Sequence, residues 1–365
     1  MTEPVNIKPL TSLRFFAAMW VVMFHYWPKL DASGMPPLVA KGYLGVECFF
    51  VLSGFILCHV YLPPYEAGRF KYADFLWARL ARIYPLHLAT MAGMGLMAAV
   101  ALALGFQADP NVLSLAALPA NLTLTQAWGL APVAGWNHPS WSISAEWFAY
   151  LMFPLFALAA IALRARPWLA VAGAVALMAG LYTVFPLIAG FPLTKATIAW
   201  GALRIVPCFS LGCALYLAWR GWAADRRTAV AGAYVFGAAA LVCAQFGAPD
   251  LLTVASFGGL IITLAQGSKT GATLGSSPIL VYLGEVSYSV YMVCIPWMVL
   301  CTNVATKILH LDGKQLPLFA WLILLVTVVP VAAASHHLIE RPARRWMKLW
   351  YESRQSGKFS AVSVR

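Results

Sequence analysis

Residues 316–339 read LPLFAWLILLVTVVPVAAASHHLI, a run without a single Asp, Glu, Lys or Arg. A transmembrane helix needs about 20 consecutive, mostly apolar residues, so this stretch is long and apolar enough to cross a bilayer. The same test, applied to the rest of the chain, finds further segments at 10–28, 43–62, 83–106, 141–163, 168–189, 202–219, 228–246, 250–266 and 279–305. The sequence therefore predicts an all-α, polytopic membrane bundle of about ten transmembrane helices.

Composition agrees with a membrane protein. Of 365 residues, 61% are hydrophobic and 10% are charged, whereas soluble domains carry about 25% charged residues. The net charge of +12 does not indicate nucleic-acid binding, because the basic residues stand at span ends instead of forming one cluster with stacking aromatic residues. The seven cysteines are odd in number, lie mostly in apolar runs and form no CxxC pair. We therefore predict neither a disulfide framework nor a metal site.

The distribution of Lys and Arg orients the bundle. Of 25 such residues, Arg14 and Arg204 lie in or at the edge of spans; with the N-terminus inside, 18 face inward and five outward, namely Lys29, Lys41, Lys195, Lys307 and Lys314. Cytoplasmic loops are enriched in Lys and Arg, and the long outer segment 107–140 contains neither. Both termini are thus predicted to be cytoplasmic. The first apolar segment lacks a small-residue cleavage site, so we expect it to be retained as the first span.

Three segments outside the spans have predicted roles. Residues 70–82 are amphipathic and are expected to form an interfacial helix on the inner surface. Residues 112–127 are expected to form a short outer helix. The domain is predicted to cover residues 1–345, and residues 346–365 form a basic cytoplasmic tail.

Ionisable residues within spans are costly, so they mark candidate functional sites. Arg14 and His25 are eleven residues apart, which places them on one face of a helix and about 16.5 Å apart along its axis. With the predicted orientation, Arg14 lies near the inner side and His25 near the outer side. This arrangement indicates a passage through the protein. The simpler alternative is that Arg14 reaches lipid headgroups and His25 is an ordinary interfacial residue.

A second group is predicted near the outer face. Glu47, His138 and Glu146 should share the layer of His25, and Tyr150 follows Glu146 by four residues, so the two side chains are neighbours. A carboxylate beside an imidazole fixes its tautomer and stabilises its charged form, and an imidazole is the usual base for a hydroxyl. Glu47 could equally serve as an inter-helix counter-ion.

Arg79 and Arg82 stand three residues apart at the predicted inner surface, so their guanidinium groups lie on nearly one face. Paired guanidinium groups bind phosphate or pyrophosphate through bidentate hydrogen bonds. Anionic lipid headgroups are the alternative ligand.

Six sequence blocks, in order from residue 7 to about 345, resemble the acyltransferase-3 family of bacterial membrane O-acyltransferases. The blocks are IKPLTSLR at 7–14 with His25, GVECFFVLSGF at 45–55, RLARIYP at 79–85, WSISAE at 141–146 with Tyr150, LGEVSYSVY at 283–291 and ERP at 340–342. Two positions depart from the family pattern: Cys294 stands where a His is common, and Ala149 where an aromatic residue is expected.

The resemblance implies a multi-pass protein of the bacterial inner membrane that uses cytoplasmic acyl-CoA, usually acetyl-CoA, as donor substrate. The acceptor is implied to be a hydroxyl of an extracytoplasmic glycan or lipid-linked sugar. Arg79 and Arg82 are implied to hold the CoA phosphates, Arg14 to lie along the thioester arm, and His25 to be the base. We predict that Glu146 or Glu47 orients His25, and that Glu47, His138 and Tyr150 contribute to substrate binding.

Two other classes stay open at this stage. A transporter or flippase of a polar lipid or glycan precursor also fits ten spans with buried charges, although we find no inverted symmetry between two halves of the sequence. A membrane scaffold would leave the intramembrane Arg, His and Glu residues without a role. Transfer through an acyl-His25 intermediate and direct transfer both agree with the residues present.

Overall fold

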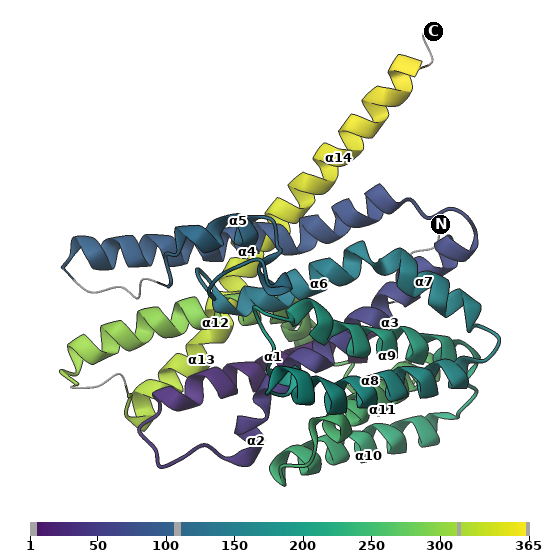
Figure 1. Ribbon diagram of the computed structural model, residues 1–365, viewed down its shortest axis with the longest axis horizontal. Coiled ribbons are helices and arrows are strands. Elements are labelled where there is room, and N and C mark those ends of the chain that lie inside the picture. The colour runs from purple at the N-terminus through teal and green to yellow at the C-terminus, as the bar shows by residue number, and fades with distance from the viewer. Residues whose placement is uncertain (1–5, 106–110, 312–314, 363–365) are drawn as a thin grey trace.

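The computed structural model describes residues 6–105, 111–311 and 315–362, with side chains described through residue 354. Its helices are α1 Lys8–Tyr26, α2 Pro37–Ala40, α3 Gly45–Glu66, α4 Tyr72–Ala103, α5 Leu118–Leu122, α6 Trp141–Leu151, α7 Phe153–Ala162, α8 Pro167–Ala189, α9 Gly201–Gly221, α10 Arg226–Gln245, α11 Asp250–Lys269, α12 Pro278–Ile308, α13 Leu318–Ser335 and α14 Arg341–Val362. Most lie along one direction in a single bundle (Figure 1). The described residues contain no β-strand, which confirms the predicted all-α class.

The predicted spans correspond closely to these helices. In the described ranges, eight helices are long and apolar enough to cross a membrane, and α6 with α7 forms a ninth candidate that is bent by 56°. The remaining predicted span is α1, whose 19 residues extend about 28 Å at 1.5 Å per residue. Its mean hydropathy is reduced by Lys8, Arg14 and His25. The protein is therefore a polytopic helical membrane protein.

Helix α1 lies inside the bundle, where it packs against α3, α11, α12 and α13. Glycines permit the closest helix contacts. A Cβ added to Gly284 of α12 would lie 2.0 Å from the Thr11 carbonyl oxygen of α1. Similarly, a Cβ on Gly212 of α9 would lie 2.1 Å from the Val51 oxygen of α3. Small residues let membrane helices approach closely where lipid supplies no hydrophobic driving force.

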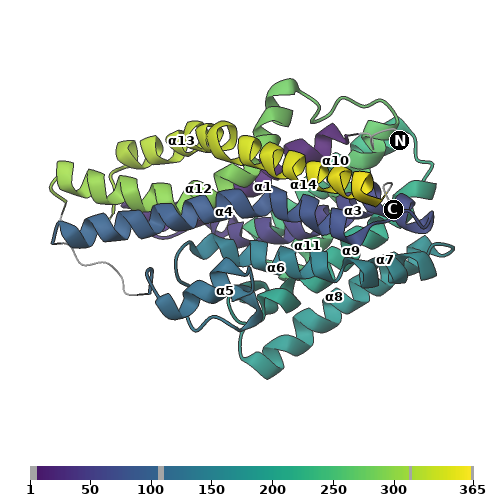
Figure 2. The same cartoon turned by 90° about the horizontal axis from the view of Figure 1, so that it is seen from above.

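One end of the bundle contains the start of α1, the turn between α3 and α4 and the turn between α11 and α12 (Figures 1 and 2). We call it the terminal end. Ser12 near the start of α1 donates to the Gly275 oxygen of the last of these turns at 2.6 Å. The other end, where α12 finishes and α13 begins, is the distal end.

The flanking segments differ in part from the prediction. Residues 70–82 do not form a separate interfacial helix, because α4 runs without a break from Tyr72 to Ala103. Residues 112–127 do form short helical turns, among them α5. The stretch that follows them, up to α6, reaches into the bundle. The Asn137 side chain donates to the Thr90 hydroxyl halfway along α4 and to the Met292 oxygen halfway along α12, at 3.1 and 3.0 Å. This segment therefore folds back between the helices.

Candidate functional site

A cavity of about 50 Å³ lies where α1, α3, α6 and α12 meet. A water molecule needs about 10–15 Å³ of such space, so the cavity has room for a few waters. Its lining combines aromatic residues with polar groups from three helices: Arg14, Val46, Phe49, Phe50, Ser142, Ile143, Glu146, Tyr288 and Tyr291. Its lining is therefore mostly apolar, and polar groups enter it from α1, α6 and α12.

Arginines gather on the terminal side of this cavity. Arg14 of α1 lies within electrostatic range of Arg82 and Glu146. Arg79 donates from Nη2 to the Tyr61 hydroxyl at 3.1 Å, and its Cζ lies 5.4 Å from the centre of that ring. Among the described residues, the Nε atoms of Arg14 and Arg79 are buried without a hydrogen-bond partner. Guanidinium groups with unused donors suit an anionic ligand.

Glu146 belongs to the same region. Its Oε1 accepts a hydrogen bond from the Ser53 hydroxyl of α3 at 2.7 Å. The Tyr150 hydroxyl also hydrogen-bonds this carboxylate, as their spacing of four residues predicts. Glu146 and Tyr150 therefore face the arginines, with Tyr150 in electrostatic range of Arg79 and Arg82.

His25 lies towards the distal end of α1. Its Nδ1 is 2.9 Å from the Val21 carbonyl oxygen. A carbonyl can only accept, so this contact places the proton on Nδ1 and leaves the Nε2 lone pair available to take a proton. The ring packs edge to face against Phe24, with centroids 5.2 Å apart. His138 lies within electrostatic range of His25, so the structure brings these two predicted residues together.

Glu47 is engaged elsewhere. Its carboxylate accepts from Nε and Nη2 of Arg204 at 2.6 and 3.0 Å, and both side chains are buried, with exposures of 0% and 2%. Arg204 also donates from Nη1 to the Ala196 oxygen at 2.8 Å, and its Cζ lies 4.6 Å from the centre of the Trp141 ring. Glu47 is thus a counter-ion between α3 and α9, one of the two roles that the sequence left open.

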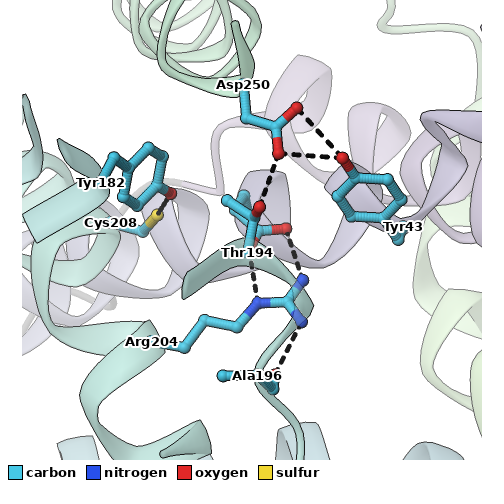
Figure 3. A network of polar contacts seen from close by, with 8 residues as sticks. Tyr43, Tyr182, Thr194, Ala196, Arg204, Cys208 and Asp250 are labelled. Carbon is cyan, nitrogen blue, oxygen red and sulfur yellow. Dashed lines mark hydrogen bonds and ion pairs between the residues drawn. The ribbon is translucent and has the colours of Figure 1, made fainter. Parts of the chain in front are cut away.

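The Arg204 pair adjoins a polar network at the distal end (Figure 3). Asp250, the first residue of α11, accepts from Lys41 at 2.5 Å, from the Tyr43 hydroxyl at 3.0 and 2.9 Å, and from Thr194 at 2.5 Å. Because Thr194 and Ala196 belong to one short segment, that segment is held by Asp250 and Arg204 together. The network fastens the distal loops to α9 and α11.

Of the four residues predicted to share one layer, His25, Glu47 and His138 lie towards the distal end, but Glu146 does not. In the described chain, neither Glu47 nor Glu146 hydrogen-bonds the His25 ring, and the Val21 carbonyl orients the imidazole instead. The error has a physical cause. Depth was inferred by starting the fourth span at an outer surface, but the segment before α6 folds into the bundle, which brings Glu146 to the level of Arg14.

Two charged residues, Arg204 and Arg344, were given no individual role from sequence, and Glu340 was recognised only as part of the Glu-Arg-Pro block. Arg204 was assigned to the edge of a span. Glu340, 2% exposed, accepts from Ser289 of α12 at 2.8 Å and lies 2.9 Å from Nδ1 of His336. Arg344 of α14 lies within electrostatic range of Arg79, Arg82 and Glu340. The signal for Arg344 was its position two residues after the Glu-Arg-Pro block, but the sequence analysis counted it only among the basic residues of the inner side.

Comparison with known proteins identifies the family of the chain. The profile of a family described as an acyltransferase domain matches residues 8–337. The chain belongs to the acyltransferase-3 family. It is 31% identical to acyltransferase MdmB of Streptomyces mycarofaciens over 327 residues, which cover 79% of this chain and 78% of that protein.

Two further relatives extend the comparison. O-acetyltransferase OatA of Staphylococcus aureus is 22% identical over 379 aligned residues, covering 94% of this chain and 58% of OatA. Protein 2 in the picA locus of Rhizobium radiobacter is 32% identical over 160 residues, or 40% of this chain. No solved structure matches the chain significantly. The family resemblance predicted from sequence is confirmed, and the protein is a membrane O-acyltransferase.

Proposed function

We propose that this acyltransferase takes an acyl group, most simply acetyl, from acyl-CoA on the cytoplasmic side of the bacterial inner membrane. It passes the group to a hydroxyl of an extracytoplasmic acceptor, a cell-surface glycan or a lipid-linked sugar. One observation carries the proposal: α1 places Arg14 among arginines at its terminal end, where Arg14 lines the cavity, and His25 at its distal end. The 18-to-5 distribution of Lys and Arg supports assigning the terminal end to the cytoplasm.

On the donor side, Arg79 and Arg82 hold the phosphates of CoA and Arg14 lies along the thioester arm. Glu146 keeps Arg14 in place electrostatically, and Ser53 and Tyr150 hold the Glu146 carboxylate. The cavity holds only a few waters, so entry of the arm has to move aromatic side chains. Phe49 and Tyr291, whose rings meet edge to face at 6.2 Å, both line it.

On the acceptor side, His25 is the base. Its Nε2 takes the proton of the acceptor hydroxyl while the hydroxyl oxygen bonds to the thioester carbonyl carbon. The C–S bond then breaks, and the CoA thiolate leaves and recovers the proton from the imidazolium. His138 lies beside His25 and is placed to contact the acceptor. Glu47 supports this end through Arg204 rather than by touching substrate.

The proposal is tested in membrane vesicles supplied with radiolabelled acetyl-CoA. We expect release of free thiol together with label in a glycan or lipid fraction. His25→Gln should abolish transfer and keep acetyl-CoA binding, whereas Arg79→Ala/Arg82→Ala should weaken binding. His337→Gln is the matched control, because this exposed imidazole stacks on Tyr282 away from the cavity. Transfer that survives His25→Gln would show that the base is misassigned, and absence of acetyl-CoA binding by the folded wild type would refute the donor.

A further inference from the structure

We infer that the C-terminal helix α14 completes the donor site, and that its Arg344 binds the 3′-phosphate on the adenosine of acyl-CoA. This inference rests on the proposed function and adds Arg344, which lies just before the predicted C-terminal tail, to the donor site. It depends on how α14 is held against α4, on where that places Arg344, and on the charge already gathered there.

Helix α14 is fastened to the start of α4 by aromatic contacts. Trp77 of α4 stacks on Trp350 and Tyr351 of α14, with ring centroids 5.2 and 5.3 Å apart and interplanar angles of 28° and 17°. The Trp77 indole also donates to the Met347 carbonyl oxygen at 3.0 Å, and the Tyr351 hydroxyl donates to Asp74 at 2.9 Å. These contacts, which we call the aromatic clasp, fix α14 against α4, and the two helices cross in Figure 2.

The clasp also sets the register between the two helices. Tyr351 is opposite Asp74 and Met347 is opposite Trp77, so the helices run antiparallel. One turn back from Met347 along α14 corresponds to about one turn forward from Trp77 along α4. Arg344 is therefore opposite the turn that carries Arg79 and Arg82, in agreement with its electrostatic range to both.

The resulting cluster has an excess of positive charge. Four guanidinium groups, those of Arg14, Arg79, Arg82 and Arg344, stand against the carboxylates of Glu146 and Glu340. Both carboxylates are already engaged: Glu146 by Ser53 and Glu340 by Ser289 and His336. Because the Nε donors of Arg14 and Arg79 are buried and unused, this cluster is suited to a ligand with several negative charges.

The different exposures of the four arginines indicate how acyl-CoA is oriented in the cluster. Arg344 is exposed, Arg79 and Arg82 are half-buried, and Arg14 lines the internal cavity. In acyl-CoA the thioester is at one end and the 3′-phosphate of the adenosine is towards the other. A phosphomonoester carries a charge of about −1.5 to −2 at pH 7. Placing the thioester at the cavity thus leaves the 3′-phosphate for Arg344. An anionic lipid headgroup has the same chemistry and is the competing ligand.

The test compares acetyl-CoA with acetyl-dephospho-CoA, which lacks only the 3′-phosphate. Dissociation constants of both are measured by calorimetry on the purified full chain as wild type, Arg344→Gln and Arg345→Gln. We expect Arg344→Gln to bind acetyl-CoA about tenfold more weakly, the effect of losing one charged hydrogen bond. It should bind acetyl-dephospho-CoA as the wild type does. Arg345→Gln, the adjacent arginine on α14, should match the wild type with both compounds.

A second variant tests the clasp. Trp350→Ala removes no arginine from the chain but loosens α14, which carries Arg344, so it should weaken acetyl-CoA binding and again spare acetyl-dephospho-CoA. The inference would be overturned if Arg344→Gln and the wild type bound acetyl-CoA with equal affinity. It would also be overturned if Arg344→Gln lost the same factor in affinity for acetyl-CoA and for acetyl-dephospho-CoA. An Arg344→Gln effect that appears only in nanodiscs with anionic lipid would assign Arg344 to lipid. Failure of the wild type to bind acetyl-CoA at all would instead remove the proposed donor.

Discussion

The buried pair of Glu47 and Arg204 gives the sharpest prediction about the fold. Replacing Arg204 with Met leaves a fully buried carboxylate without its two hydrogen bonds of 2.6 and 3.0 Å. Breaking a buried ion pair on one side costs about 3–5 kcal/mol, because the remaining charge is desolvated and uncompensated. We expect Arg204→Met and Glu47→Leu each to lower the stability of the bundle by roughly this amount.

The double variant Glu47→Leu/Arg204→Met should recover most of the loss. Replacing both partners by apolar residues of similar size is often neutral, since no charge is then left buried. What is not recovered is the bond of Arg204 to the Ala196 oxygen, about 1 kcal/mol. The two substitutions should therefore be strongly coupled: the single losses sum to roughly 6–10 kcal/mol and the double variant loses only about 1 kcal/mol, so the interaction free energy is about 5 kcal/mol or more in magnitude.

The assay is the apparent melting temperature of each purified variant, followed through intrinsic tryptophan fluorescence. Arg220→Met is the control: Arg220 pairs with Glu66 at 3.0 Å, but it is 42% exposed, so its loss should cost less than about 1 kcal/mol. A melting temperature of Arg204→Met equal to the wild type would refute the reasoning. So would a double variant less stable than either single one. A stable Glu47→Gln variant without transferase activity would show that Glu47 acts in the chemistry.

Two further predictions concern packing and pH. Gly212→Val should lower the melting temperature, by about 1–3 kcal/mol of stability, because its side chain would meet the α3 backbone; Gly173→Val, whose Cβ meets nothing within 4 Å, should not. Lys195 lies outside the spans with Nζ 3.1 Å from the centre of the Tyr43 ring, and desolvation lowers its pKa to about 8. Only the free amine is acylated, so labelling of Lys195 by acetic anhydride should reach half its maximum near pH 8, measured by mass spectrometry against Lys29. A profile for Lys195 that matches that of Lys29 would contradict this environment.

The sequence was sufficient to select candidate site residues, but not to identify the side chains that they contact. Arg14 and His25 share one helix, so their relation follows from helical geometry alone, as does the contact between Glu146 and Tyr150. The assignment of Glu146 to His25 required knowing how α6 enters the bundle. The hydrophobic periodicity of the sequence does not predict that the segment before α6 folds back into the bundle, where Asn137 contacts Met292.

The sequence by itself determined the class of the protein, the positions of its spans and its family, because the length and apolarity of a membrane helix are local properties. It also provided the Lys and Arg asymmetry on which the proposed orientation depends. Only the tertiary structure decided which charge meets which. Arg204 meets Glu47 from 157 positions away, and Arg344 reaches the Arg79 turn because Trp77 stacks on α14. Such pairings depend on the packing of helices that are distant along the chain, and burial then makes them essential, since an unpaired charge within the bundle is costly.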